Sequence, residues 1–114
     1  MKKIILLVSF FGLALVASSQ AKIDSLKLLL HAVNNDKTTV RILGELSESY
    51  AFTSPDSSLR YGRMAVDLSR RIRDDSSEIK NLIRCGGSLS FIGNASEAII
   101  LIIEGKRKIG RAHV

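Results

Sequence analysis

One helical pattern occurs twice between positions 40 and 105, about 40 residues apart. Three positions recur at a shift of 39, and three more recur at a shift of 40. The first set is Leu43, Leu46 and Tyr50 with Leu82, Cys85 and Leu89, and the second is Ser58, Leu59 and Ala65 with Ala98, Ile99 and Gly105. A two-helix unit that recurs about every 20–50 residues indicates a repeat protein, because one hairpin alone cannot bury its apolar face. Stacked hairpins of this kind offer an extended surface for binding.

The first 19 residues have the organisation of a secretory signal peptide. Lys2 and Lys3 precede an apolar run over residues 4–16, and small and polar residues follow. This run is shorter than the roughly 17–25 residues that a membrane-spanning helix needs. We expect cleavage after Ser19, with cleavage after Ala21 as one alternative and an uncleaved N-terminal anchor as another. The sequence thus predicts an exported, periplasmic protein.

The last six residues, 109–114, resemble the conceptual translation of a common sequencing adapter. We therefore expect the native sequence to be truncated near Lys108 and this tail to be non-native, the alternative being that the tail is real. In the first case Arg111 and His113 have no biological role, and any downstream segment, including a transmembrane helix, is missing.

Polar residues that favour the N-cap position precede the helices expected after the signal peptide. The expected N-caps are Thr38, Ser54, Asp75 and Asn94. Pro55 strengthens the second of these, since proline suits the first turn of a helix. Asp75 and Glu78 have the spacing of a capping box. These signals divide the chain into a lead helix over residues 20–36 and two hairpins over residues 37–74 and 75–108.

Strand-like sequence is confined to the apolar run over residues 99–103, and the cap before that run favours a helix there as well. We therefore predict an all-α fold of stacked antiparallel hairpins, preceded by the signal-peptide helix. The small residues Gly62, Ala65 and Gly86 would let neighbouring helices approach closely. A glycine in the middle of a helix costs about 1 kcal/mol relative to alanine, so we expect Gly86 to be retained for close packing.

The formal net charge is +6, and it is +4 without residues 1–19, which contain two lysines and no acids. Acidic residues interrupt the basic ones, whereas a nucleic-acid surface requires clustered basic residues. We therefore expect no nucleic-acid partner. Cys85 is the single cysteine, so the chain forms no internal disulfide. Its place on the apolar stripe predicts a buried thiol.

The repeat resembles the tetratricopeptide repeat (TPR) family over roughly residues 40–108. Leu82-x-x-Cys85-Gly86 stands where that family has Leu-x-x-Leu-Gly, and Gly93-Asn94 has the form of its inter-helix turn. The other matching positions are Leu43, Leu46 and Tyr50, then Ser58, Leu59, Tyr61 and Ala65, then Leu89, Ala98 and Ile99. The period near 40 is longer than the 34 residues usual in the family. A repeat with this longer period is similar to the N-terminal sensor regions of Bacteroidetes signalling proteins.

The resemblance implies a concave groove, formed by the first helix of each hairpin, in which peptides bind. Polar residues on those helices that lie off the apolar stripe are the groove candidates. They are Arg41, Glu45, Glu48, Asn81, Arg84 and Ser88. The core expected behind them consists of Leu43, Leu46, Tyr50, Ser58, Ala65, Leu82, Cys85, Leu89 and Ala98.

No catalytic arrangement is evident in the sequence. His31 has no second metal ligand at a suitable spacing, and the glycines lack the fixed spacing of a phosphate-binding loop. We expect no cofactor and no enzyme activity in these residues. The leading hypothesis is an exported module that binds a protein or peptide, or associates with itself, as the sensor region of a signalling protein. The alternatives are a fragment of a histidine kinase, with catalysis encoded downstream, and a stand-alone periplasmic scaffold.

Overall fold

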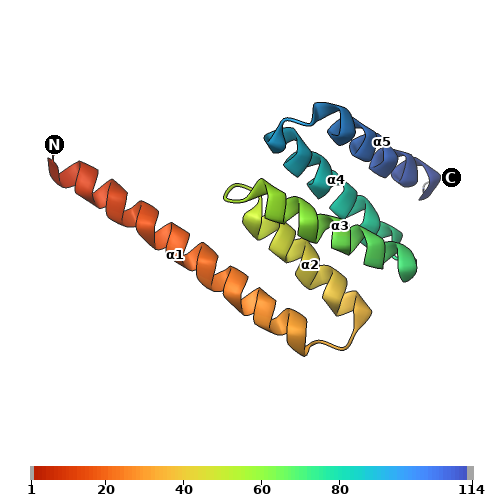
Figure 1. Ribbon diagram of the computed structural model, residues 1–114, viewed down its shortest axis with the longest axis horizontal. Coiled ribbons are helices and arrows are strands. Elements are labelled where there is room, and N and C mark those ends of the chain that lie inside the picture. The colour runs from red at the N-terminus through yellow and green to blue at the C-terminus, as the bar shows by residue number, and fades with distance from the viewer. Residues whose placement is uncertain (1, 113–114) are drawn as a thin grey trace.

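The computed structural model describes residues 2–112, and within residues 2–17 it describes the side chains of residues 3, 5 and 9 alone. Five α-helices account for nearly all of this part, with no strand among the described residues (Figure 1). They are α1 (Lys2–Ala32), α2 (Asp36–Tyr50), α3 (Pro55–Arg71), α4 (Asp75–Ile92) and α5 (Ala95–Ala112). The predicted all-helical fold class is therefore confirmed.

Each helix packs against the next one in the chain, and α2 also contacts α4. Short turns join α2 to α3, α3 to α4 and α4 to α5, so that successive helices run in opposite directions (Figure 1). The C-terminal half of α1 packs on α2, whereas its N-terminal half extends away from the other helices (Figure 1). Helix α1 is continuous through the expected cleavage site, and α5 continues through Ala112, past the end expected near Lys108. Residues 113 and 114 of the suspected tail lie outside the described part.

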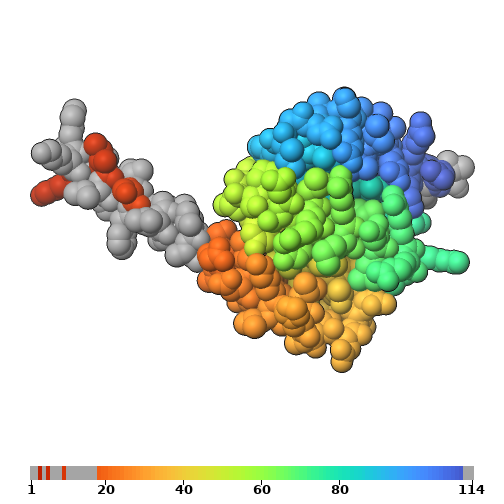
Figure 2. Space-filling model, in the orientation of Figure 1, coloured from red at the N-terminus to blue at the C-terminus, as the bar shows by residue number. Residues whose placement is uncertain are grey.

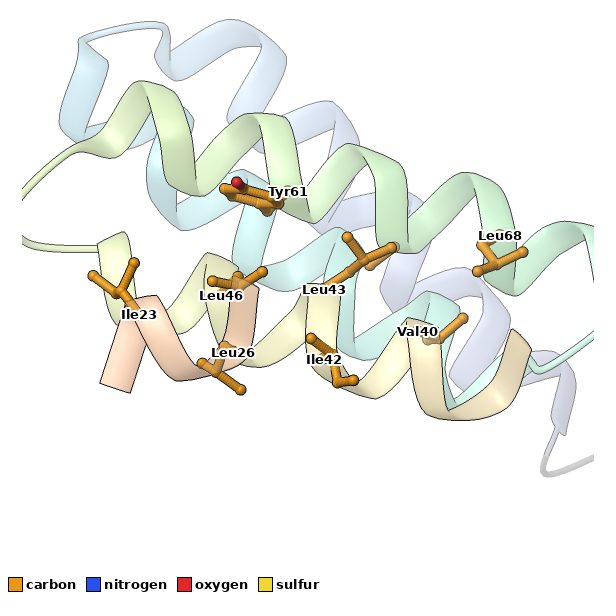
Figure 3. Close-up of a cluster of buried hydrophobic side chains, with 9 residues drawn as sticks. Ile23, Leu26, Val40, Ile42, Leu43, Leu46, Tyr61 and Leu68 are labelled. Atoms are coloured by element: carbon orange, nitrogen blue, oxygen red, sulfur yellow. The ribbon is translucent and has the colours of Figure 1, made fainter. Parts of the chain in front are cut away.

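The main core lies where α1, α2 and α3 meet (Figure 3). Its buried side chains are Ile23, Leu26, Val40, Ile42, Leu43, Leu46, Tyr61, Ala65 and Leu68. Burying one large aliphatic side chain stabilises a fold by about 1.5–3 kcal/mol. Tyr50 is partly buried at the edge of this core, and its ring stacks on the ring of Tyr61 with centroids 5.8 Å apart. A second cluster joins α3 to α4 through Val66, Leu82 and Cys85.

Glycines permit close helix contacts at two of the positions expected from the sequence. A Cβ atom added at Gly62 would lie 2.7 Å from the Sγ atom of Cys85, and one added at Gly86 would lie 2.7 Å from Cγ1 of Ile102. Both distances are too short for any larger residue unless the contacted side chain moves. The close packing predicted for Gly86 is therefore confirmed.

Two of the expected helix caps are wrong by one to three residues. Asn35, and not Thr38, caps α2, because its side chain accepts a hydrogen bond from the Thr38 backbone N–H at 3.1 Å. Asp74, and not Asp75, caps α4 by accepting from the Ser77 backbone N–H. In each case the side chain of the residue just before the helix accepts a hydrogen bond from the backbone N–H three positions later, which is the geometry of an N-cap.

The other two expected N-caps occupy the predicted positions. Ser54 precedes α3, with Pro55 in the first turn, but its hydroxyl donates to the Ser57 hydroxyl instead of capping the backbone. Asn94 accepts from the Glu97 backbone N–H at 3.3 Å, and its side-chain amide donates to the Glu97 carboxylate at 3.0 Å. Asn94 therefore caps α5, but the pair is not a full capping box, because the Asn94 backbone N–H donates to the Leu89 carbonyl oxygen and not to the Glu97 carboxylate.

Glu78 forms a buried ion cluster instead of the predicted capping box. Its side chain is 2% exposed and accepts from Arg70 Nε at 2.6 Å and from Lys108 Nζ at 2.5 Å. Arg70 also pairs with Glu104, and Lys108 also contacts Asp75. Burial alone raises the pKa of Glu78, but the two charged donors outweigh it and leave the pKa below its ordinary value. The cluster joins α3, α4 and α5.

Candidate binding surface between α2 and α4

A hollow of about 600 Å³ lies between α2 and α4. Most of its lining side chains are charged or polar. They are Lys37, Thr38, Val40, Arg41, Glu45, Glu48, Asp74, Ser77, Lys80, Asn81 and Arg84. Four are basic and three are acidic, so the surface carries side chains of both charges. We call this set the α2–α4 hollow.

The α2–α4 hollow is built from equivalent positions of the two hairpins. Three pairs of its lining residues are related by the same shift of 39 that relates the apolar stripes. These pairs are Thr38 with Ser77, Arg41 with Lys80, and Glu45 with Arg84. Because the apolar stripe of each helix faces the core, the same polar face of α2 and of α4 is left to line the hollow. The repeat therefore produces the surface.

Arg84 crosses the hollow from α4 to α2. Its guanidinium donates to the Glu48 carboxylate at 3.1 Å and to Asn81 Oδ1 at 3.1 Å. Gly44 on α2 makes room for it, since a Cβ at that position would lie 2.5 Å from Arg84 Nη1. Arg84 is 27% exposed and Glu48 is 70% exposed. Glu48 is therefore accessible to a ligand that offers an N–H or ammonium donor, since an ionised carboxylate only accepts hydrogen bonds.

The end of the hollow nearest the start of both helices carries two lysines beside an acid that is already hydrogen-bonded. Asp74 accepts from the Ser77 hydroxyl at 2.7 Å and from the Ser77 backbone N–H at 3.2 Å. These hydrogen bonds, together with the charges of Lys37 and Lys80, lower the pKa of Asp74. Lys37 and Lys80 are exposed, and within residues 2–112 neither forms an ion pair.

Five of the six residues expected in a groove line the hollow, namely Arg41, Glu45, Glu48, Asn81 and Arg84. Ser88 does not, contrary to expectation. It is 3% exposed, and its hydroxyl lies 2.8 Å from the hydroxyl of Ser58 on α3. Ser58 in turn donates to the Ser47 carbonyl oxygen at 2.6 Å. Ser88 thus lies on the face of α4 that packs against α3, where it satisfies a buried hydroxyl.

Sequence reasoning missed several lining residues near the start of each helix. Lys37, Thr38, Asp74, Ser77 and Lys80 were not among the candidates, although all of them line the hollow. The shift of 39 carried the signal for one of them, because it relates Lys80 to the candidate Arg41. Adjacent polar residues compete for the N-cap at each helix start, so the sequence alone does not assign the residues there to a face of the helix.

The residues expected in the repeat core lie behind the hollow. Those that are buried are Leu43, Leu46, Ser58, Ala65, Leu82, Cys85, Leu89 and Ala98, while Tyr50 is partly buried. Burial raises the pKa of the Cys85 thiol to about 11. Since the thiolate is the reactive form, this cysteine is unreactive near neutral pH in the folded chain.

Within residues 2–112 no group of three or more histidine, cysteine, aspartate or glutamate residues has the arrangement of a metal site. Among the residues described, no helix combines the length and the apolar character needed to span a bilayer.

The chain matches no family model, no curated protein and no solved structure.

Proposed function

We propose that this chain is a TPR-like helical repeat module that binds a protein or peptide segment in the α2–α4 hollow. The single observation that carries the proposal is that equivalent polar positions of two successive hairpins line one continuous hollow. In a repeat protein, successive hairpins present the same face side by side, and ligands bind along that face. The signal-peptide-like organisation of residues 1–19 supports a periplasmic location in this proposal, as in the sensor region of a signalling protein.

The chemistry of the hollow favours a polypeptide over an apolar small molecule. Sites for small ligands are mostly apolar, with a few polar groups that fix orientation. Here seven of eleven lining residues are charged, and two ion pairs, Arg41–Glu45 and Arg84–Glu48, lie on or across the surface. A peptide backbone and its side chains offer donors and acceptors of both kinds along their length, and such groups can replace the present partners of Arg41 and Arg84.

The proposal is tested with a phage-displayed library of random peptides, selected on the immobilised full chain. Enriched peptides are then measured by fluorescence polarisation against wild type and the double variant Arg41→Ala/Lys80→Ala. These two residues are equivalent in the repeat, and both are exposed at the hollow. The control is Arg71→Ala, which removes one exposed positive charge at the end of α3, outside the hollow.

We expect the double variant to weaken peptide binding at least about tenfold, which corresponds to 1.4 kcal/mol, while Arg71→Ala binds as wild type does. Selection of no specific peptide would overturn the proposal. So would peptides that bind wild type and the double variant equally, because they would occupy another surface.

A further inference from the structure

The α2–α4 hollow has two distinct ends. Helices α2 and α4 both begin on the side of the molecule away from the N-terminal half of α1, so they run parallel (Figure 1). Figure 2 shows that the chain passes through the stack in order, from residues 20–40 at one end to α5 at the other. Equivalent ends of α2 and α4 therefore lie on the same side, and the hollow extends from the helix starts toward the helix ends.

Basic residues predominate at the end of the hollow nearest the helix starts. Lys37, Arg41 and Lys80 line it there, and all three are exposed. Asp74 is the one acid among the described lining residues at this end, and both of its carboxylate oxygens accept hydrogen bonds from Ser77. Lys37 and Lys80 both lie close enough to Asp74 for their charges to lower its pKa. An excess of positive charge remains at this end and faces solvent.

Acidic residues predominate at the other end of the hollow. Glu45 and Glu48 line it there, together with Arg84. Arg84 donates to Glu48 at 3.1 Å, yet the Glu48 side chain is 70% exposed and the Glu45 side chain is 35% exposed. An ionised carboxylate has about four acceptor sites, so one guanidinium leaves most of them available. The hollow is therefore positive at one end and negative at the other.

The charges of α2 that face the hollow are placed against the stability of the helix. Lys37 lies in the first turn of α2 and Glu48 lies in the last turn, whereas the helix dipole favours an acid at the start and a base at the end. Asp36, the acid that the dipole favours in the first turn, lies outside the lining set. Arg41 and Glu45 also pair with the base before the acid, which stabilises a helix less than the reverse order. Helix stability thus does not account for this charge order.

We propose that the partner of the α2–α4 hollow is an extended peptide segment with separated charges, whose acidic residue binds between Lys37 and Lys80 and whose basic residue binds Glu48. This inference rests on the function proposed above and adds the charge order of the ligand. From position 37 to position 48, α2 rises by about 16 Å. An extended peptide covers that length in about five residues. A uniformly acidic ligand is disfavoured, because its far end would meet Glu45 and Glu48.

Peptide libraries of fixed charge order test the proposal on the immobilised full chain. The peptides are displayed between constant glycine-serine flanks, so that no chain terminus contributes a charge. The separated library has two aspartates at one end of five random residues and two arginines at the other, in both orders. The matched library has one aspartate and one arginine at each end, so its composition and net charge are the same. We expect the separated library to yield binders enriched at least about tenfold over those of the matched library.

The fully random library used to test the proposed function distinguishes the two proposals. Equal enrichment from the separated and matched libraries would overturn the charge order and leave peptide binding intact. Binders from the random library alone would do the same. If none of the three libraries yields a binder, both the charge order and the proposed function are overturned.

Reciprocal substitutions in the peptide and the protein test where each charge binds. Replacing both aspartates of the best separated peptide by asparagine should weaken binding to wild type about fivefold and leave binding to Lys37→Ala/Lys80→Ala unchanged. Replacing its arginines by glutamine should weaken binding to wild type but not to Glu48→Gln. Arg71→Ala, which lies outside the hollow, should respond to both peptide changes as wild type does. Peptide changes that weaken binding to wild type and to these hollow variants equally would overturn the proposal, because the charges would then pair elsewhere.

Discussion

Replacing Glu78 by glutamine tests the most buried charge among the side chains described. Glu78 is 2% exposed on α4 and receives hydrogen bonds from Arg70 on α3 and Lys108 on α5. Glutamine keeps the volume and one acceptor oxygen but removes the negative charge. It also turns an NH₂ group toward two cations, and that group can only donate. We therefore expect Glu78→Gln to destabilise the contact between all three helices.

The magnitude follows from the exposure of the partners. Removing one member of a fully buried ion pair costs about 3–5 kcal/mol, because the other charge is left without solvent or partner. Here Arg70 is 45% exposed and Lys108 is 27% exposed, so water can solvate both cations once the carboxylate is gone. Arg70 also retains Glu104. We therefore expect a smaller loss of about 2 kcal/mol, at the level of hydrogen bonds to charged groups.

Thermal melts followed by circular dichroism measure the effect on the full chain. For a domain of this size, 2 kcal/mol corresponds to a fall in Tm of about 8–16 °C. The control is Glu104→Gln, which removes a carboxylate of the same cluster that is 40% exposed. We expect it to cost less than about 1 kcal/mol, as exposed ion pairs do. If Glu78→Gln and Glu104→Gln lower Tm equally, the buried cluster does not stabilise the fold as argued.

The pH dependence gives an independent check. The pKa of Glu78 is lowered in the folded chain, so the folded state holds its proton less tightly than the unfolded chain does. Its contribution to stability is present above the ordinary glutamate pKa and is lost as the pH falls through the folded value. Glu78→Gln lacks this titration. The difference in the free energy of unfolding between wild type and Glu78→Gln should therefore shrink on acidification, and a constant difference would refute the reasoning.

Three further predictions concern glycine packing, the buried thiol and export. Gly87→Ala should stabilise the chain by up to about 1 kcal/mol, since a Cβ there meets nothing within 4 Å, whereas Gly86→Ala should lower Tm because its Cβ would collide with α5. Cys85 should resist a maleimide reagent at pH 8 until denaturant is added, since it is buried with a pKa of about 11; rapid labelling of the native chain would contradict this. Expression in a Gram-negative host should give a periplasmic product that begins at Gln20 or Lys22, and N-terminal sequencing that finds Met1 on a cytosolic product would contradict export.

The elements that the sequence predicted well are those governed by local periodicity. The apolar stripe that includes Leu43 and Leu46 and its copy at Leu82 and Cys85 set the packing face of α2 and α4, and these side chains are buried. Apolar residues spaced by three and four positions lie on one face of an α-helix, whereas in an extended strand they would alternate between faces. The same stripes left the polar face toward the α2–α4 hollow, so five of its residues could be named in advance.

The helix starts could not be placed to the residue, because adjacent polar residues compete for each cap. Asp74 and Asp75 are both good N-cap residues, and local sequence does not decide between them. The decision comes from tertiary structure. With Asp74 as the cap, Glu78 is the fourth residue of α4 and not the third, and it faces Arg70 and Lys108, which are 8 and 30 residues away in the sequence. A capping box can be recognised within four residues, but an ion cluster of three helices cannot.

Ser88 shows a second limit of the repeat as a guide. The shift that relates the stripes of α2 and α4 is 39, and at this shift the groove residue Glu48 corresponds to Gly87, not to Ser88. One residue is about 100° of rotation around a helix. The polar side chain of Ser88 is thereby carried from the hollow into the contact with α3, where Ser58 satisfies it. The repeat, with a shift of 39 for the first helix of each hairpin and 40 for the second helix, thus predicts which faces pack. The position of an individual polar side chain depends instead on the hydrogen-bond partner that the fold brings to it.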